Sequence, residues 1–141
     1  MPLMRISLRA DTPAQTQRAI ADGVHRALVD AIGTPEADRF QIIERFPAEA
    51  LIADPTYLGV SRQNVVFVNI ALARGRSSEK KAALFAGIAK HLARAGVRGE
   101  DVFVTLTENG RDDWSVGYGQ QQLLDDELLR RYGWIPPTPT S

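Results

Sequence analysis

Two stretches of the chain repeat the same order of strand-like and helix-like patterns. Residues 2–8 mostly alternate between apolar and other side chains, the period of a strand with one buried face. An apolar residue at every fourth position from Ile20 to Ile32 predicts an amphipathic helix, which Gly33 would end. Residues 40–46 then read as a second strand. The first part of the chain therefore predicts a βαβ unit.

The same order returns in the middle of the chain. Residues 64–72 form a more continuously apolar strand, and Ser77 or Ser78 is a typical helix N-cap. Apolar residues at every fourth position from Leu84 to Leu92 repeat the helical stripe, which Gly96 would end. We define repeat one as residues 2–46 and repeat two as residues 64–107.

Two tandem βαβ units with right-handed crossovers predict an α+β fold. Their parallel pairs can join into one four-stranded sheet that carries both helices on one face. The opposite face is then bare. Because residues 65–72 are apolar on both sides, we expect that face to meet another subunit of a homo-oligomer.

The rest of the chain extends this single domain, which we place at residues 1–135. Residues 108–135 predict a glycine-punctuated loop and then a short amphipathic helix near residues 122–132. The proline-rich residues 136–141 read as a disordered tail.

Composition narrows the kinds of partner. The chain has 141 residues, and its 17 basic and 17 acidic side chains cancel. No lysine and arginine cluster is long enough to indicate binding to nucleic acid or to an anionic membrane, so we expect a small-molecule or protein partner. The 44% hydrophobic content suits one domain with an ordinary core.

Residue counts also narrow the chemistry. The chain has no cysteine and two histidines, His25 and His91, which excludes thiolate chemistry and a histidine-rich metal site. We therefore expect chemistry without a metal. No signal-peptide pattern and no apolar stretch of about 20 residues are present, and we expect a cytoplasmic protein without a membrane span.

Pro2 is the first candidate for catalysis. If Met1 is removed, the chain begins with a secondary amine held in a ring at the start of a strand. An α-amino group has an ordinary pKa of about 7.7 to 8.0, so burial or a neighbouring charge can make it either a base or a cationic acid.

A set of motifs in fixed order resembles the tautomerase superfamily, and within it the malonate semialdehyde decarboxylase family. The motifs are Met1-Pro2-Leu3, Pro35 with Asp38-Arg39-Phe40-Gln41, Arg74-Gly75-Arg76-Ser77 with Glu79, Asp101-Val102, and Glu108-Asn109 with Asp113-Trp114-Ser115 and Gly117. They extend over most of the chain, from residue 1 to about residue 119.

The resemblance implies a tautomerase-like (MIF-like) fold, a homotrimer and an active site that uses Pro2 without a cofactor. It also implies that Asp38 lies near the proline and that Arg74 and Arg76 bind a substrate carboxylate. Dehalogenase relatives tend to show Arg-x-x-Arg, so the spacing here favours the decarboxylase branch. The chain departs from that branch at Val116, where an aromatic residue is usual, and in its longer C-terminal tail.

These residues suit the decarboxylation of a 3-oxo acid, which needs a sink for the released electrons. A cationic Pro2 could serve as acid or electrostatic catalyst, because Asp38 would raise the pKa of its amine. In a continuing strand Arg74 and Arg76 would project to the same face and grip one carboxylate. Trp114 and Val116 could form an apolar wall of the substrate pocket.

The leading interpretation is a decarboxylase that converts malonate semialdehyde to acetaldehyde and CO2. One alternative on the same site is a tautomerase of 2-oxo acids, or a hydratase or dehalogenase of unsaturated 3-carbon acids. Another is a non-enzymatic trimeric module in which Pro2 is incidental.

Structural roles for the candidate residues stay open at this point. Asp38, like Asp101 in repeat two, could simply cap a turn. Trp114 could be a structural anchor rather than a substrate contact. We expect His25 at the surface or edge of the first helix rather than in acid–base chemistry.

Overall fold

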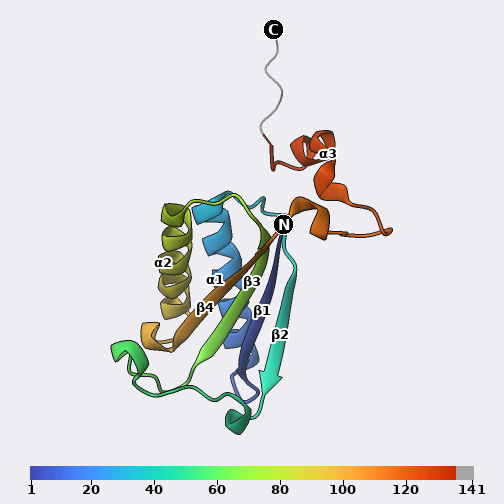
Figure 1. Ribbon diagram of the computed structural model, residues 1–141. Helices are drawn as coiled ribbons and strands as arrows, with labels where there is room; N and C mark the ends of the chain where they lie inside the picture. Colours follow the sequence, from blue (N-terminus) through green and yellow to red (C-terminus); the bar gives the residue numbers. More distant parts are fainter. Residues whose placement is uncertain (136–141) are drawn as a thin grey trace.

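The computed structural model describes residues 1–135, and the predicted tail, residues 136–141, lies outside the described residues (Figure 1). The strands are β1 (Pro2–Arg9), β2 (Gln41–Phe46), β3 (Val66–Ala73) and β4 (Val102–Asn109), and the helices are α1 (Ala14–Ile32), α2 (Ser78–Arg94) and the short α3 (Asp126–Arg131).

The strands form one mixed sheet in the order β2-β1-β3-β4. β1 is parallel to β2 and β3 is parallel to β4, while β1 and β3 pair antiparallel at the centre. Helices α1 and α2 lie side by side on one face of this sheet (Figure 1). The predicted α+β fold with two joined βαβ units is confirmed.

The core lies between the sheet and these two helices. Both predicted helical stripes pack there, with Ile32 only partly buried, together with alternate residues of β1 and β3. Each fully buried Leu, Ile or Val contributes about 1.5–3 kcal/mol. The fully buried side chains include Met4, Ile6, Leu8, Ile20, Val24, Leu28, Val68, Ile70, Leu72, Leu84, Ile88 and Leu92.

The helix ends also follow the sequence pattern. Gly33 adopts a left-handed conformation, with φ of 73°, where α1 ends. The Ser77 hydroxyl accepts a hydrogen bond from the Lys80 amide and caps the start of α2. Gly33 thus ends α1 before the turn that leads to β2, and Ser77 starts α2 after the turn that follows β3.

The other face of the sheet carries no helix (Figure 1). Its side chains are mixed: the Arg5 guanidinium lies 2.7 Å from a Glu44 carboxylate oxygen, and the Phe67 and Phe103 rings meet edge to face, 5.2 Å apart. This face is less apolar than the continuous run in β3 indicated, because polar residues of β1 and β2 share it. Association through it stays a prediction.

The C-terminal segment is more broken than the predicted helix near residues 122–132. A 3-10 turn at Gln122–Leu124 precedes α3, which begins where the Asp125 carboxylate accepts a hydrogen bond from the Leu128 amide. This segment lies beside the start of the chain (Figure 1). Across the described residues, none of the helices combines the length and apolar character needed to cross a membrane.

The contact between α1 and α2 depends on a close approach at Gly23. A Cβ at this position would lie 3.1 Å from the His91 Cβ and 3.2 Å from a Leu92 methyl carbon, so α2 must move. We expect Gly23→Ala to destabilise the fold by up to about 2 kcal/mol, because overpacking costs more than the roughly 1 kcal/mol that alanine gains over glycine in a helix.

Thermal unfolding of the two helix-glycine variants tests this expectation. Gly87→Ala is the matched control, because its Cβ would lie an ordinary 3.4 Å from the Ala27 Cβ. Its melting temperature should equal or exceed that of the parent chain. A Gly23→Ala chain as stable as Gly87→Ala would contradict the close helix contact.

Candidate active site

The start of the chain lies against a buried carboxylate. The Met1 amine is 3.6 Å from Asp38 Oδ2, and only 6% of the Asp38 side chain is exposed. Parallel pairing explains this contact: the Met4 amide donates to the Phe40 carbonyl, so the turn before β2 lies beside the start of β1. An amine and a carboxyl group therefore meet in a poorly solvated position.

Asp38 receives a second donor on the same oxygen. The Trp134 indole N–H donates to Asp38 Oδ2 over 3.0 Å, while Oδ1 is buried and has no hydrogen-bond partner within residues 1–135. Burial raises the pKa of Asp38, and the terminal amine, the Trp134 donor and the nearby His25 oppose that rise.

Burial also controls the amine. It lowers the pKa of the Met1 amine from its ordinary value of 8.0 to about 6, with Asp38 opposing this effect and Arg76 adding to it. While Met1 is present, the Pro2 nitrogen is part of an amide and has no basicity. Removal of Met1 would make Pro2, which is buried at the start of β1, the terminal amine.

Arg76 is the second charged group next to the amine. Its guanidinium donates to the Ala73 carbonyl over 2.5 Å and lies over the Trp134 ring, 5.5 Å from the ring centroid. Burial lowers the pKa of Arg76, and the Glu108 carboxylate at the end of β4 raises it. Arg76 is therefore a partly desolvated cation.

Arg74 and Arg76 do not share a strand face as expected. β3 ends at Ala73, and Gly75 has φ of 132°, a conformation that breaks the extended strand. The turn nevertheless leaves both arginines lining one cavity, where Arg74 is more exposed than Arg76.

Two cavities meet at Met1. One has a volume of about 240 Å³ and is lined by Met1, Arg74, Arg76, Arg111 and Trp134, among others. The other has a volume of about 260 Å³ and is lined by Met1, Pro2, Leu3, Phe40, Trp114, Ser115 and Val116. With Asp38 beside the amine, the structure brings all six predicted site residues to this end of the sheet.

The predicted apolar wall is built by the loop after β4. The Trp114 indole N–H donates to Asn109 Oδ1 over 2.7 Å, so Trp114 is anchored and also lines the cavity beside Pro2. The Val116 amide donates to the Gln122 side chain, and the Val116 side chain stays 42% exposed. This wall is open to solvent on the described chain.

The two repeats use their equivalent aspartates differently. Asp101 Oδ1 accepts hydrogen bonds from the Gln63 and Asn64 amides over 2.8 and 3.1 Å, which is the turn role considered for both residues. Asp38 makes no such bond to backbone within residues 1–135 and instead faces the terminal amine. The turn-cap interpretation is therefore wrong for Asp38.

Sequence reasoning missed Trp134 and Arg111. Trp134 joins Asp38 to Arg76, and the Arg111 guanidinium donates to the Leu123 carbonyl and to Asp126, holding the C-terminal segment. The only sequence feature that could have drawn attention to Trp134 was the presence of a tryptophan soon after the polar residues of α3. Nothing in its sequence position indicated a contact 96 residues away.

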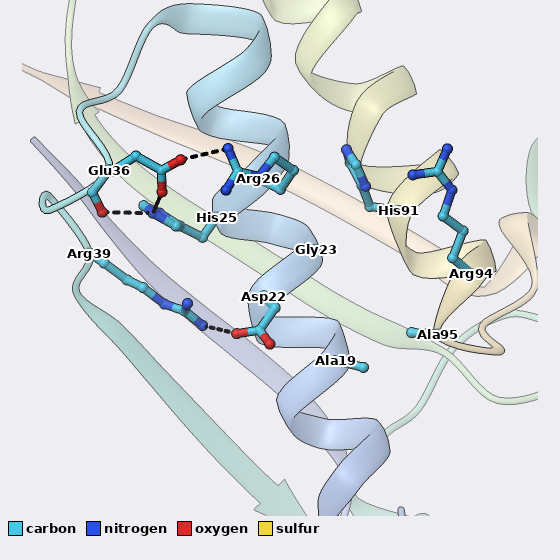
Figure 2. A pocket seen from close by; sticks show the side chains of 10 residues that line it. All are labelled: Ala19, Asp22, Gly23, His25, Arg26, Glu36, Arg39, His91, Arg94 and Ala95. Carbon is cyan, nitrogen blue, oxygen red and sulfur yellow. Dashed lines mark hydrogen bonds and ion pairs between the residues drawn. The ribbon is translucent and has the colours of Figure 1, made fainter.

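His25 was expected at the surface or edge of the first helix, but it is buried. Its Nε2 lies 3.0 Å from the Glu36 carbonyl oxygen, because α1 packs against the turn that leads to Asp38. Figure 2 shows His25 at the edge of a surface groove of about 590 Å³ between α1 and α2, where the Arg26–Glu36 and Arg39–Asp22 ion pairs also lie. This groove is separate from the two cavities at Met1.

Within the part of the chain that the structure describes, no group of three or more His, Asp or Glu side chains is placed to hold a metal ion. The site consists instead of an amine, a carboxylate, arginines and tryptophans. Such a set can bind an anionic molecule and transfer a proton to or from it.

Matches to two family models together cover most of the chain. Two family models, each described as "Tautomerase enzyme", match residues 38–117 and residues 2–61. Among curated proteins, probable tautomerase YusQ of Bacillus subtilis (strain 168) is 33% identical over 127 residues, which cover 89% of this chain and all of the relative.

Solved structures with the same fold include two malonate semialdehyde decarboxylases. The FG41 enzyme inhibited by 3-bromopropiolate is 42% identical, with a TM-score of 0.84, over 89% of this chain and 96% of that one. The other is 31% identical, with a TM-score of 0.82, over 89% of this chain and 98% of that one. It was solved in wild-type, inactivated and first-residue proline-to-alanine forms to explain decarboxylase and hydratase activities. A fused 4-OT symmetric trimer is 26% identical, with a TM-score of 0.71, over 84% and 94%.

The charge of Asp38 should raise the pKa of the terminal amine. We expect Asp38→Asn to lower the pKa of that amine below its value in the parent chain, because the substitution removes the opposing carboxylate and leaves burial and Arg76 in place. The pH dependence of the ¹⁵N resonance of the amine measures this change.

Asp101→Asn is the matched control for this titration. It occupies the equivalent place in repeat two, and its amide oxygen can still accept from the Gln63 and Asn64 amides. The amine should titrate in this variant as in the parent. An unchanged amine pKa in Asp38→Asn would show that the carboxylate does not act on the amine.

Proposed function

Because this chain belongs to the tautomerase family, we propose that it is a cofactor-independent enzyme that decarboxylates a 3-oxo acid, converting malonate semialdehyde to acetaldehyde and CO2. The proposal assigns catalysis to Pro2, Asp38, Arg74 and Arg76, and further substrate contacts to Trp114 and Val116. It requires removal of Met1, so that Pro2 carries the terminal amine.

The observation that carries the proposal is the buried carboxylate beside the chain terminus. Asp38 Oδ2 lies 3.6 Å from the amine of Met1, the residue directly before Pro2, in a position where solvent screening of the charge is weak. A carboxylate at this distance stabilises a cationic amine, and decarboxylation needs a cation or acid rather than a base. The identity with two malonate semialdehyde decarboxylases supports the same reaction.

The proposed reaction moves one electron pair and one proton. The bond between the carboxylate carbon and C2 breaks, CO2 leaves, and the electron pair passes from C2 toward the aldehyde oxygen to form an enolate. Cationic Pro2 stabilises that oxygen through a hydrogen bond or proton. A proton then reaches C2, and the net reaction consumes one proton and yields acetaldehyde.

The arginines supply the carboxylate site in this proposal. Arg74 and Arg76 line the same cavity beside Met1, and a guanidinium can hold a carboxylate through two parallel hydrogen bonds. Such a grip can keep the carboxylate plane perpendicular to the carbonyl group, which aligns the breaking bond with the π system. The partial burial of Arg76 strengthens its attraction for an anion.

The second cavity suits the departing group. Pro2, Phe40, Trp114 and Val116 line it with mostly apolar surface. A neutral molecule such as CO2 or acetaldehyde is more stable on such a surface than an anion is. We assign Trp114 and Val116 to substrate contact for this reason.

We also propose that the working form is a homotrimer of this single domain, residues 1–135. The helix-free face of the sheet supplies a surface for association, and a structure with the same fold, the fused 4-OT, is a symmetric trimer. The expected substrate is a small carboxylate, in keeping with the arginines that line the first cavity.

A second candidate is tautomerisation of a 2-oxo acid or hydration of an unsaturated 3-carbon acid at the same site. Burial lowers the pKa of the Met1 amine to about 6, and a similar burial of the Pro2 amine would favour its neutral, basic form at pH 7. The curated relative YusQ is named a probable tautomerase. The protonation state of Pro2 during turnover separates this candidate from the decarboxylase.

Turnover of malonate semialdehyde tests the leading proposal. We expect mass spectrometry to show a chain that begins at Pro2, and we expect this chain to release acetaldehyde and CO2. Pro2→Ala should lower turnover at least about 100-fold, in the range typical of losing a general acid. The pH profile tests the role: turnover by a cationic proline falls as the pH rises above the pKa of its amine, whereas turnover by a base grows. No acetaldehyde from a chain with free Pro2 would overturn the decarboxylase assignment.

Loss of an arginine should weaken binding of the substrate carboxylate. We expect Arg76→Ala to lower kcat/KM roughly 10- to 100-fold, the effect of losing a hydrogen bond to a charged group. Arg18→Ala is the control, because the Arg18 side chain is 74% exposed on α1. Steady-state kinetics with malonate semialdehyde measure both variants, and full activity in Arg76→Ala would contradict the assignment.

A further inference from the structure

We propose that Trp134 is a positioning residue of this active site, holding the Asp38 carboxylate through its indole N–H and the Arg76 guanidinium through its ring. The inference rests on the proposed function for its catalytic meaning. Its two contacts are observed in this structure and do not depend on that function.

The end of α3 explains how Trp134 reaches the site. The Trp134 amide donates to the Leu129 carbonyl and the Gly133 amide donates to the Arg130 carbonyl, a Schellman arrangement that ends the helix. Gly133 has φ of 88°, which turns the next residue back across the helix end. Trp134 and Leu129 then line the same cavity as Met1.

The segment that carries Trp134 is tied to the domain at a second point. Arg111, just after β4, donates from Nε to the Leu123 carbonyl over 2.8 Å and from its terminal nitrogen to Asp126 Oδ1 over 2.7 Å. These bonds attach both the turn before α3 and the start of α3. The position of Trp134 is therefore supported by contacts on both sides of α3.

The contact with Asp38 acts on the reacting charges. An indole N–H can only donate a hydrogen bond, so at Oδ2 it stabilises the anionic carboxylate more than the neutral acid. It binds the same oxygen that faces the terminal amine. Trp134 thus keeps Asp38 available as a negative charge next to the amine.

The contact with Arg76 acts on substrate binding. The indole ring lies against the guanidinium, 5.5 Å from the ring centroid, and such a contact gains strength where the cation is partly desolvated. The guanidinium has five N–H donors, so beside the ring it can donate both to the Ala73 carbonyl and to a bound carboxylate. Trp134 therefore limits how Arg76 can turn.

Several charged groups act on Asp38, on the terminal amine and on Arg76. The terminal amine comes from the start of β1, His25 from α1, Arg76 from the turn after β3, and Glu108, which acts on Arg76, from the end of β4. Removing the indole donor from this set raises the pKa of Asp38, because the donor stabilises the charged form more than the neutral form. The proton that the amine and the carboxylate share is then lost at a higher pH than in the parent chain.

Trp134→Phe and Trp134→Leu separate the two contacts in the full chain. Phenylalanine keeps a ring over Arg76 but loses the N–H. The ¹³C resonance of the Asp38 carboxylate should therefore titrate at higher pH in Trp134→Phe. The KM for malonate semialdehyde should change less than about twofold. Leucine loses both the N–H and the ring. Trp134→Leu should therefore show the same shift of the Asp38 titration and, in addition, a KM raised about tenfold, which corresponds to roughly 1.4 kcal/mol. Tyr132→Phe, on the same segment and with a 64% exposed ring, should change neither quantity.

A measurement on the parent chain keeps the proposal testable if a variant does not fold. The Trp134 indole N–H resonance should move with pH at the midpoint of the Asp38 titration. An indole resonance that ignores that titration, or an unshifted Asp38 in a folded Trp134→Phe chain, overturns the inference. Shifted titrations with no turnover of malonate semialdehyde by the parent would instead retain this role for Trp134 and overturn the proposed function.

Discussion

The antiparallel pairing of β1 with β3 is the constraint on which the site depends. Pro2 pairs with Leu72, so the start of the chain lies where β3 ends and the turn with Arg74 and Arg76 begins. The parallel pairing of β1 with β2 places Asp38 at the same end of the sheet. Three segments distant in sequence therefore deliver an amine, a carboxylate and two guanidinium groups to one place, and the core beneath them holds the register through alternate buried residues.

The internal repeat explains why this end of the sheet, and not the opposite end, carries the reactive group. Each repeat places an aspartate just before its second strand. In repeat two, peptide N–H groups precede β3 and saturate Asp101 Oδ1. In repeat one, the chain begins at that position, so Asp38 faces an amine that can gain or lose a proton. The same structural unit thus yields a turn at one end of the sheet and a titratable pair at the other.

The sequence predicted the parts of this structure that depend on periodicity. Apolar residues four apart located α1 and α2, and the βαβ order determined the sheet, because burial of one face fixes where each element lies. The candidate residues came from ordered motifs rather than periodicity. Trp134 could not be predicted in the same way, because its contacts depend on where the end of α3 lies in space. The expected common face of Arg74 and Arg76 failed because Gly75 ends the extended conformation that the expectation assumed.

The acid–base character of the site follows from two opposed effects on the same atoms. Burial lowers the pKa of the amine and raises that of Asp38, so burial alone favours a neutral pair. Attraction between the two groups favours the charged pair. When such effects nearly balance, a single donor or cation decides where the proton lies, and here those groups are the Trp134 indole and the Arg76 guanidinium. Trp134 belongs to neither repeat. A change in the C-terminal segment can therefore alter the chemistry of this site while the sheet, the amine and the aspartate stay in place.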